Sequence, residues 1–175
     1  MISPQPSKGY ASHHPKITVA VITLSDRSHR GERTDASGPL MAQLVNAHAS
    51  YQVVETLLLP DDQETLRGEL IRLSDQVGVN LVLTTGGTGF SPRDTTPEAT
   101  LAVGERLAPG IAEAIRAYSL NITPTAMLSR AAAVIRGQTV MVNLPGSPKA
   151  VAEILDYLLS PLSHGIGTLL GREDG

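Results

Sequence analysis

Residues 80–98 read NLVLTTGGTGFSPRDTTPE and contain a complete change of local structure. The segment begins with an apolar run that is typical of a buried strand, and it passes directly into closely spaced glycines and threonines. It ends in Thr-Thr-Pro-Glu, which predicts a helix with Thr96 as its N-cap and Pro97 as its first residue. A strand that leads through a glycine loop into a helix is typical of an α/β fold.

Two more strands and two helices are predicted before this segment. Residues 16–24 (KITVAVITL) and 51–59 (YQVVETLLL) are apolar and β-branched, which indicates strands. Residues 39–49 and 60–77 carry apolar side chains at helical spacing. The order strand, helix, strand, helix, strand predicts parallel strands joined by right-handed crossovers.

The second half of the chain is predicted to add helices and a hairpin. Helices are expected at 109–120 and 123–130, and the two apolar runs within 131–144 indicate a hairpin or two closely spaced strands. Two more helices are expected to begin at the Ser-Pro pairs 147–148 and 160–161, with each serine as the N-cap. The sequence therefore predicts a three-layer α/β/α sandwich, mostly parallel, with a short antiparallel strand in the C-terminal half.

Composition limits the domain organisation and the function. The chain has 175 residues, which suits one domain at 16–175 preceded by a disordered tail at 1–15. A net charge of −3 and 3% aromatic residues argue against nucleic-acid binding. No apolar run is long enough to cross a membrane, and the absence of cysteine excludes thiolate catalysis and fits a reducing compartment. We therefore expect a cytoplasmic protein.

Polar or glycine-rich segments follow four of the predicted strands, at 25–27, 60–62, 86–89 and 145–149. Because the carboxyl ends of parallel strands meet at one edge of a sheet, we expect these segments to converge where α/β sheets bind ligands. Glycines at such a place let backbone N–H groups approach an anion such as a phosphate. The convergence of four segments is a stronger indication than any one of them.

Each segment also has a purely structural interpretation. The glycines could form only a tight turn that needs positive φ. Asp61 could cap the following helix, with Glu64 completing a capping box. Asp94 could pair with the adjacent Arg93 or accept hydrogen bonds from loop amides. These alternatives stay open on the local sequence alone.

Two other charged features also have a structural interpretation. Asp26 and Arg27 could be a solvated pair in a loop. Lys149 lies in the first turn of a predicted helix, where a positive charge is unfavourable, so its place there makes more sense if an anion binds nearby.

Five motifs occur along the chain in the order TLSDRSHRGERTDASG, LLPDDQETL, LVLTTGGTGFSPRDTTPEAT, PTAMLSR and VNLPGSPKAV. Their order and spacing resemble those of the MoaB/Mog family of molybdenum cofactor biosynthesis proteins. The resemblance runs from about residue 17 to about residue 170, and it is most specific in TTGGTG, RDTTPEA and NLPGSP.

The resemblance implies a sandwich fold that forms trimers, and a reaction that joins molybdopterin to ATP in the presence of Mg²⁺. The two essential aspartates of the family fall on Asp61 and Asp94, which are implied to be catalytic and to bind the metal. The implied nucleotide-binding residues are Gly86, Gly87, Thr88, Gly89, Pro145, Gly146 and Ser147. The implied pterin-binding residues are Ser25, Asp26, Arg27, Arg93 and Lys149.

The chemistry of such a reaction is compatible with these residue types. The nucleophile would be the phosphate of molybdopterin, which is already ionised, so the protein mainly has to bring two anions together. Carboxylates repel phosphates, so their use implies a bridging Mg²⁺. Implied partners are molybdopterin, ATP, further copies in a homotrimer and the molybdate-inserting enzyme of the same pathway. The alternative is a non-catalytic molybdopterin-binding or scaffold protein of the same family.

Overall fold

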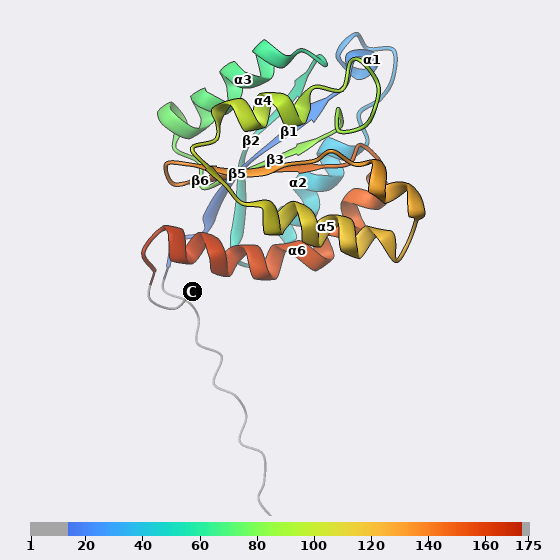
Figure 1. The fold of residues 1–175 in the computed structure, drawn as a ribbon. Coiled ribbons are helices and arrows are strands. Elements are labelled where there is room, and N and C mark those ends of the chain that lie inside the picture. Colours follow the sequence, from blue (N-terminus) through green and yellow to red (C-terminus); the bar gives the residue numbers. More distant parts are fainter. Residues whose placement is uncertain (1–13, 173–175) are drawn as a thin grey trace, which may run out of the picture.

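The computed structural model describes residues 14–172, so almost all of the predicted tail at 1–15 lies outside the described residues. One six-stranded sheet has the order β2-β1-β3-β6-β5-β4, and β2, β1, β3 and β6 run parallel (Figure 1). These four strands are β1 (Ile17–Leu24), β2 (Tyr51–Leu59), β3 (Leu81–Thr85) and β6 (Thr139–Leu144). The predicted parallel sheet is confirmed.

The remaining two strands are antiparallel and lie at one edge of the sheet. β5 (Ala133–Arg136) pairs with β6 as a hairpin, as the sequence predicts. β4 (Arg106–Leu107) pairs with β5 and was not predicted, because two exposed residues carry no periodic signal.

Helices cover both faces of the sheet, with α3 and α4 on one face and α2, α5 and α6 on the other (Figure 1). Among the described residues, no helix has both the length and the apolar character needed to span a membrane. The helices are α1 (Asp26–His29), α2 (Ser37–Ala47), α3 (Gln63–Ile71), which continues as a wider π turn at η1 (Arg72–Val77), α4 (Thr96–Val103), α5 (Pro109–Leu120), the 3-10 helix η2 (Pro124–Leu128) and α6 (Pro148–Leu169).

The central strand β1 shows why the sheet needs both helical layers. Val19 and Val21 belong to the core that contacts α2 and α6, whereas Ala20 and Ile22 belong to the core beneath α3 and α4. Successive side chains of a strand point to opposite faces, so a nearly continuous apolar strand must be covered twice. This confirms the predicted three-layer α/β/α sandwich.

The predicted helix start at residues 160–161 is wrong, because α6 continues without a break through Pro161. A proline inside a helix loses one backbone hydrogen bond and crowds the preceding turn. Here the cost is outweighed by packing, since Leu158, Leu162 and Ile166 on both sides of the proline are buried in one core. The Tyr51 hydroxyl also donates to the carbonyl of Leu159 at 2.6 Å, which ties the same turn to β2.

Two smaller predictions also need correction. The helix expected at 123–130 is only the short 3-10 helix η2. The N-cap of α4 is Thr95 rather than Thr96. The Thr96 hydroxyl instead donates to the carbonyl of Gly86 at 3.0 Å, so it holds the glycine loop.

Replacing Asn143 by alanine is expected to destabilise the protein strongly. Its buried side-chain amide donates to the hydroxyls of Thr84 and Thr100, both at 2.9 Å, and accepts from the backbone N–H of Ala132 at 3.1 Å. Loss of these bonds leaves buried polar groups unpaired, at a cost of about 3 kcal/mol and roughly 6–12 °C in Tm. Asn121→Ala, at an exposed helix end, is the control. Equal melting curves for the two variants would contradict the expectation.

Candidate active site

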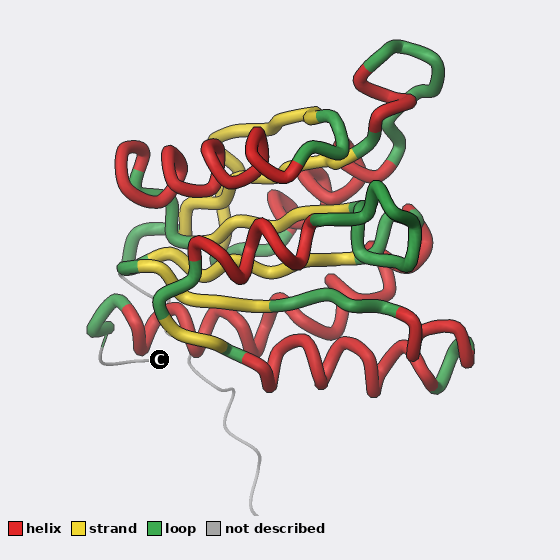
Figure 2. Tube along the Cα trace, turned by 45° about the horizontal axis from the view of Figure 1, so that its top comes forward, coloured by secondary structure: helices red, strands yellow, loops and turns green. Residues whose placement is uncertain are grey.

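The ends of the four parallel strands lie at one edge of the sheet. In the register of the sheet, Leu24 pairs with Leu59, Thr23 with Thr85, and Thr85 with Leu144. Figure 2 shows the loops that follow gathered along one side of the molecule. The predicted convergence of the polar segments is therefore confirmed.

The glycine loop after β3 needs its glycines for conformation and for close approach. Gly86 and Gly87 have φ values of 94° and 68°, which non-glycine residues rarely adopt. A Cβ on Gly86 would lie 2.4 Å from the carbonyl oxygen of Leu24. The Cα of Gly86 is also 3.5 Å from where a Cβ on Gly146 would be. The interpretation of these glycines as a tight turn is therefore correct. The turn also brings together the loops that follow β1, β3 and β6.

The helix-cap interpretation of Asp61 is wrong. The N-cap of α3 is Asp62, whose carboxylate accepts from the backbone N–H of Thr65 at 2.8 Å. Asp61 instead accepts from the backbone N–H of Asp26 at 2.9 Å, and its own N–H donates to the Asp26 carboxylate at 3.0 Å. This reciprocal pair joins the loops after β1 and β2.

Arg93 joins the glycine loop to the same pair. Its guanidinium donates two hydrogen bonds of 2.9 Å to the Asp26 carboxylate. The suggested pairing of Arg93 with Asp94 is therefore wrong, and so is a solvated pair of Asp26 with Arg27. Arg27 lies exposed on α1.

Asp94 holds its own loop. Its Oδ2 accepts from the backbone N–H groups of Gly89 and Ser91, both at 3.1 Å, so the loop-amide interpretation is confirmed. Asp61 lies along the same loop, because its Oδ1 is 3.5 Å from the Cβ position of Gly87. The two carboxylates therefore lie beside the same glycine loop.

The electrostatics of Asp61 differ from those of its neighbours. Burial raises the pKa of Asp61, and the negative charges of Asp26 and Asp94 raise it further, against the lowering effects of the hydrogen bond from the Asp26 N–H and of the Arg93 charge. The hydrogen bonds from Arg93 lower the pKa of Asp26. A partly buried carboxylate with a raised pKa beside other acids is a common feature of functional sites.

These carboxylates fit a magnesium site only in part. The described part of the chain contains no group of three His, Cys, Asp or Glu side chains placed to hold a metal ion. Mg²⁺ usually takes one or two carboxylates and completes its octahedron with waters and substrate phosphates. Asp61 and Asp94 could supply those carboxylates, with waters and substrate phosphates as the other ligands.

Two cavities lie on either side of the glycine loop, and they differ in character. The polar cavity has a volume of about 310 Å³, and its lining includes Thr23, Ser25, Asp35, Ser37, Gly86 and Gly146. The apolar cavity has a volume of about 480 Å³, and its lining includes Thr88, Gly89, Ile115, Ile122, Ala126 and Leu128. Ser147 lines both.

Only some of the predicted site residues line these two cavities; Asp61, Asp94, Gly87, Asp26, Arg27 and Arg93 line neither. In the predicted nucleotide set, Gly86 and Gly146 face the polar cavity, whereas Thr88, Gly89 and Pro145 face the apolar one. In the predicted pterin set, Ser25 lines the polar cavity, whereas Lys149 lines the apolar cavity. Asp26 and Arg93 lie with Asp61.

The profile of a probable molybdopterin binding domain matches residues 20–164. The chain belongs to this family. It is 45% identical over 141 residues to the molybdopterin adenylyltransferase of Haemophilus influenzae, with 80% of this chain and 72% of that protein covered. It is 43% identical over 141 residues to the enzyme of the same name from Escherichia coli K12, with the same shares covered.

Solved structures of the family have the same fold. A MoaB structure from Thermus thermophilus gives a TM-score of 0.82 at 41% identity, covering 89% of this chain and 97% of that chain. A molybdopterin biosynthesis protein from Mycobacterium abscessus gives 0.83 at 36% identity, covering 91% and 99%. The resemblance to MoaB/Mog proteins is confirmed.

Sequence reasoning missed part of the polar cavity of this family member. Asp35 accepts from the backbone N–H of Gly38 at 3.0 Å, and the Ser37 hydroxyl donates to the carbonyl of Gly146 at 2.7 Å. An Asp-x-Ser-Gly sequence at the start of a helix is a recognisable turn signal. It does not indicate that the turn contacts a loop more than a hundred residues away.

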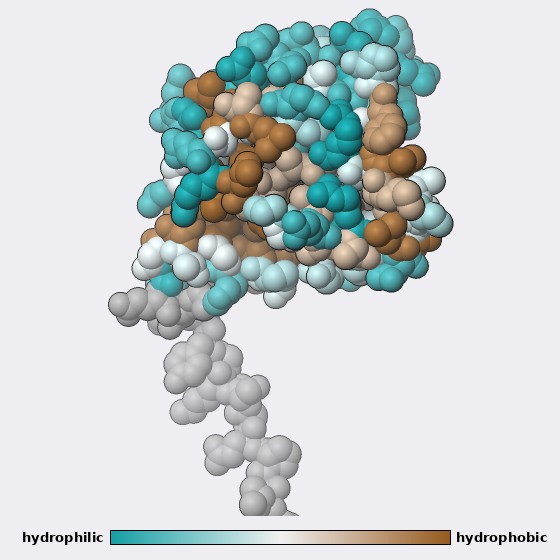
Figure 3. Space-filling model, viewed as in Figure 1, coloured by the Kyte–Doolittle hydropathy of each residue, from teal (hydrophilic) through white to brown (hydrophobic). Residues whose placement is uncertain are grey.

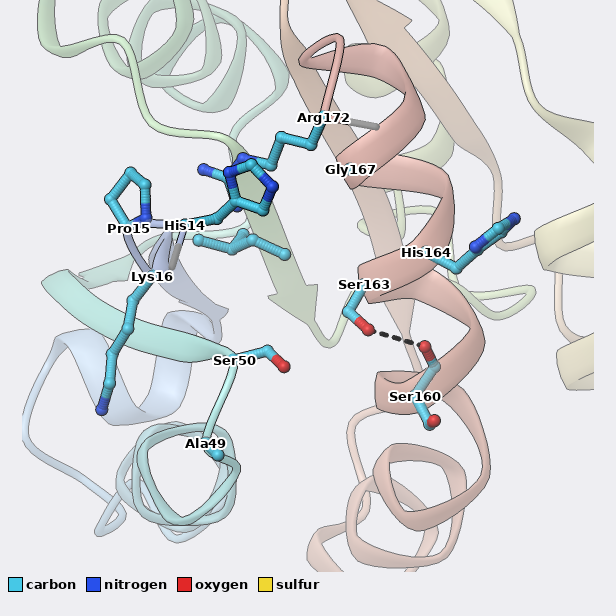
Figure 4. Close-up of a pocket in the computed structure, with 11 residues that line it drawn as sticks. His14, Pro15, Lys16, Ala49, Ser50, Ser160, Ser163, His164, Gly167 and Arg172 are labelled. Atoms are coloured by element: carbon cyan, nitrogen blue, oxygen red, sulfur yellow. Dashed lines mark hydrogen bonds between the residues drawn. The ribbon is translucent and has the colours of Figure 1, made fainter. Parts of the chain in front are cut away.

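A third cavity, of about 350 Å³, lies at the opposite edge of the sheet, where β1 begins (Figure 4). Its lining includes Lys16, Ser50, His164 and Arg172. Figure 4 shows Lys16 and His164 extending in different directions from different elements. We take the glycine loop, where the polar strand-end segments meet, as the candidate active site of this family member.

Proposed function

We propose that this protein is a molybdopterin adenylyltransferase. A phosphate oxygen of molybdopterin bonds to the α-phosphorus of ATP, the bond from that phosphorus to the bridging oxygen breaks, and pyrophosphate leaves. The observation that carries the proposal is the pair of dissimilar cavities separated by one glycine loop, with Asp61 and Asp94 beside that loop. Relatives that bear this name, at 43% and 45% identity, support it.

The glycine loop has free donors for a phosphate. Within residues 14–172, the backbone N–H groups of Gly87 and Thr88 donate to no acceptor, whereas that of Gly86 donates to the carbonyl of Leu144 at 3.3 Å. Preorganised N–H groups in a turn stabilise the charge that develops on a transferring phosphoryl group. We infer that Gly87 and Thr88 orient the α-phosphate.

Asp61 and Asp94 would hold Mg²⁺ between the loop and the phosphates. When bound, the metal would neutralise phosphate charge and favour departure of pyrophosphate. Asp61 is held by the N–H of Asp26 and Asp94 by two loop amides, so both carboxylates are fixed before substrate binds. Such preorganisation reduces the cost of aligning two anions.

The chemistry of the cavities suggests which substrate occupies each. Adenine is flat and has fewer hydrogen-bonding groups than a pterin, so it suits the apolar cavity with Ile115, Ile122 and Leu128. A pterin carries amino, amide and ring nitrogen groups, so it suits the polar cavity with Ser25 and Asp35. We propose that the phosphates of both substrates meet at the glycine loop.

The proposal is tested by incubating the protein with molybdopterin, ATP and Mg²⁺. Pyrophosphate and adenylylated molybdopterin are expected in equal amounts. ATP with a methylene group between the α- and β-phosphates should bind but give neither product. Binding of molybdopterin and ATP without any pyrophosphate would contradict the enzyme and favour the non-catalytic binding protein.

We also propose that the protein is a homotrimer that passes its product to the molybdate-inserting enzyme of the same pathway. Exposed hydrophobic side chains outside the two cavities include Leu107, Leu120 and Met127, and Figure 3 shows hydrophobic patches on the visible face. Such patches often mark contacts between chains. Analytical ultracentrifugation should give three times the 18.4 kDa mass of one chain. The mass of a single chain would contradict the trimer.

A further inference from the structure

Arg130, which lies between η2 and β5, holds the loop that carries Asp94. Its Nε donates to the carbonyl of Gly89 at 2.7 Å, and its Nη2 donates to the carbonyl of Asp94 at 2.6 Å. Its backbone N–H donates to the carbonyl of Thr88 at 2.9 Å. Its Nη1 pairs with the carboxylate of Glu98.

Through these contacts, one guanidinium group binds two separate carbonyls of the loop. The carboxylate of Asp94 binds the amides of Gly89 and Ser91 inside the loop, while Arg130 binds the carbonyls of Gly89 and Asp94 outside it. The planar fork of an arginine can hold several acceptors in fixed directions, which a single ammonium group does not do. The backbone position of Asp94 is therefore determined from both sides.

Arg130 is itself anchored to two helices. Glu98, its carboxylate partner, lies in the first turn of α4. From α5, Arg116 donates to the carbonyl of Ala131 at 2.8 Å and to that of Ser129 at 3.4 Å, on either side of Arg130. The loop is therefore anchored, through Arg130, to the helices α4 and α5 rather than to another loop.

We propose that Arg130 is a positioning residue that holds Asp94 where its carboxylate can share a magnesium ion with Asp61. This rests on the proposed function. All three guanidinium nitrogens of Arg130 already have protein partners, so it acts through Asp94 rather than on a substrate. Its effect should appear in the dependence of activity on Mg²⁺.

Arg130→Lys tests the proposal, with Arg136→Lys as a matched control. Arg136 also bonds a backbone carbonyl, that of Val103 at 3.1 Å, and the carboxylate of Asp75, at 2.9 and 2.6 Å, but it is the last residue of β5 and pairs with Thr139, where β6 begins, away from the glycine loop. In Arg130→Lys the Mg²⁺ concentration for half-maximal adenylylation should rise about 10-fold or more, as for partners of metal ligands in general. In Arg136→Lys it should not change.

Hydrogen exchange of the peptide over residues 86–96 gives a readout that does not depend on activity. Arg130→Lys should speed exchange at the amides of Gly89 and Ser91, and Arg136→Lys should not. If the wild type makes no adenylylated product, the proposed function is overturned. If Arg130→Lys nevertheless exchanges faster, the hold of Arg130 on the loop is still supported. Unchanged exchange together with unchanged Mg²⁺ dependence would overturn the positioning role.

Glu98→Gln covers the case in which Arg130→Lys does not fold. It keeps both carbonyl contacts of Arg130 and removes only the ionic anchor, so it should shift exchange and Mg²⁺ dependence in the same direction by a smaller factor. No shift in either quantity would count against the proposal.

Discussion

Asp61→Asn is expected to slow adenylyl-molybdopterin formation by about 100-fold or more, as for loss of a group that stabilises transition-state charge. The fold should be kept, because an asparagine oxygen can still accept from the N–H of Asp26. The loss arises because a neutral amide binds Mg²⁺ more weakly than a carboxylate. Rates at saturating ATP and Mg²⁺, with melting curves on the same samples, provide the measurement.

The same variant should be as stable as the wild type at pH 7, or more stable by up to about 3 °C. The pKa of Asp61 is raised in the folded protein, so its protonated form is favoured there. The stability that this pKa shift contributes is fully present below the ordinary pKa of 3.8. It is lost as the pH rises through the raised pKa of the folded protein. The difference in Tm should therefore shrink in acid. As the pH is lowered, wild-type activity should also begin to fall at a higher pH than it would for an aspartate with an ordinary pKa.

Asp62→Asn is the matched control for Asp61→Asn. Asp62 is the adjacent aspartate, and it caps α3 through the N–H of Thr65. Because asparagine caps helices about as well as aspartate, this variant should change neither rate nor Tm appreciably. Equal activity in the wild type, Asp61→Asn and Asp62→Asn would remove the catalytic role of Asp61.

Gly87→Ala is expected to abolish ATP binding and to lower stability. Gly87 has a φ of 68°, and its added methyl would lie 2.3 Å from the hydroxyl oxygen of Thr96 and 3.5 Å from a carboxylate oxygen of Asp61. Thr96 would have to move and give up its hydrogen bond to Gly86. We expect a loss of about 2–4 kcal/mol in the free energy of unfolding. ATP titration by calorimetry, below the melting temperature, measures the binding.

Gly137→Ala separates backbone strain from the effect on the site. Gly137 has a φ of 53°, and its added methyl would meet nothing within 4 Å. Since it follows β5 away from the glycine loop, it should cost only about 1–2 kcal/mol of strain and leave ATP affinity unchanged. Unaltered ATP affinity in Gly87→Ala would mean that the glycine loop is only a turn.

Much of the fold could be predicted because its signals are local. The alternating contacts of β1 follow from a nearly continuous run of apolar residues, and the parallel order follows from helices placed between strands. Local signals failed where packing opposed them. Pro161 has the sequence features of a helix start, yet buried leucines before and after it keep α6 continuous.

The location of the candidate site was also predictable, but its internal contacts were not. Adjacent glycines after a strand are typical of a turn with positive φ, as found at Gly86 and Gly87, and strand ends of a parallel sheet meet at one edge. The partner of Arg93, by contrast, lies 67 residues away at Asp26, and that of Asp61 lies 35 residues away.

The sequence by itself thus determined the layers, the parallel sheet and the edge at which the loops meet. Only the tertiary structure decided that Asp62 caps the helix while Asp61 faces the glycine loop, and that Arg130 holds Asp94. The physical reason is range. Helix and strand preferences act over a few residues, whereas a hydrogen bond between distant segments exists only once the packed sheet has brought them within about 3 Å.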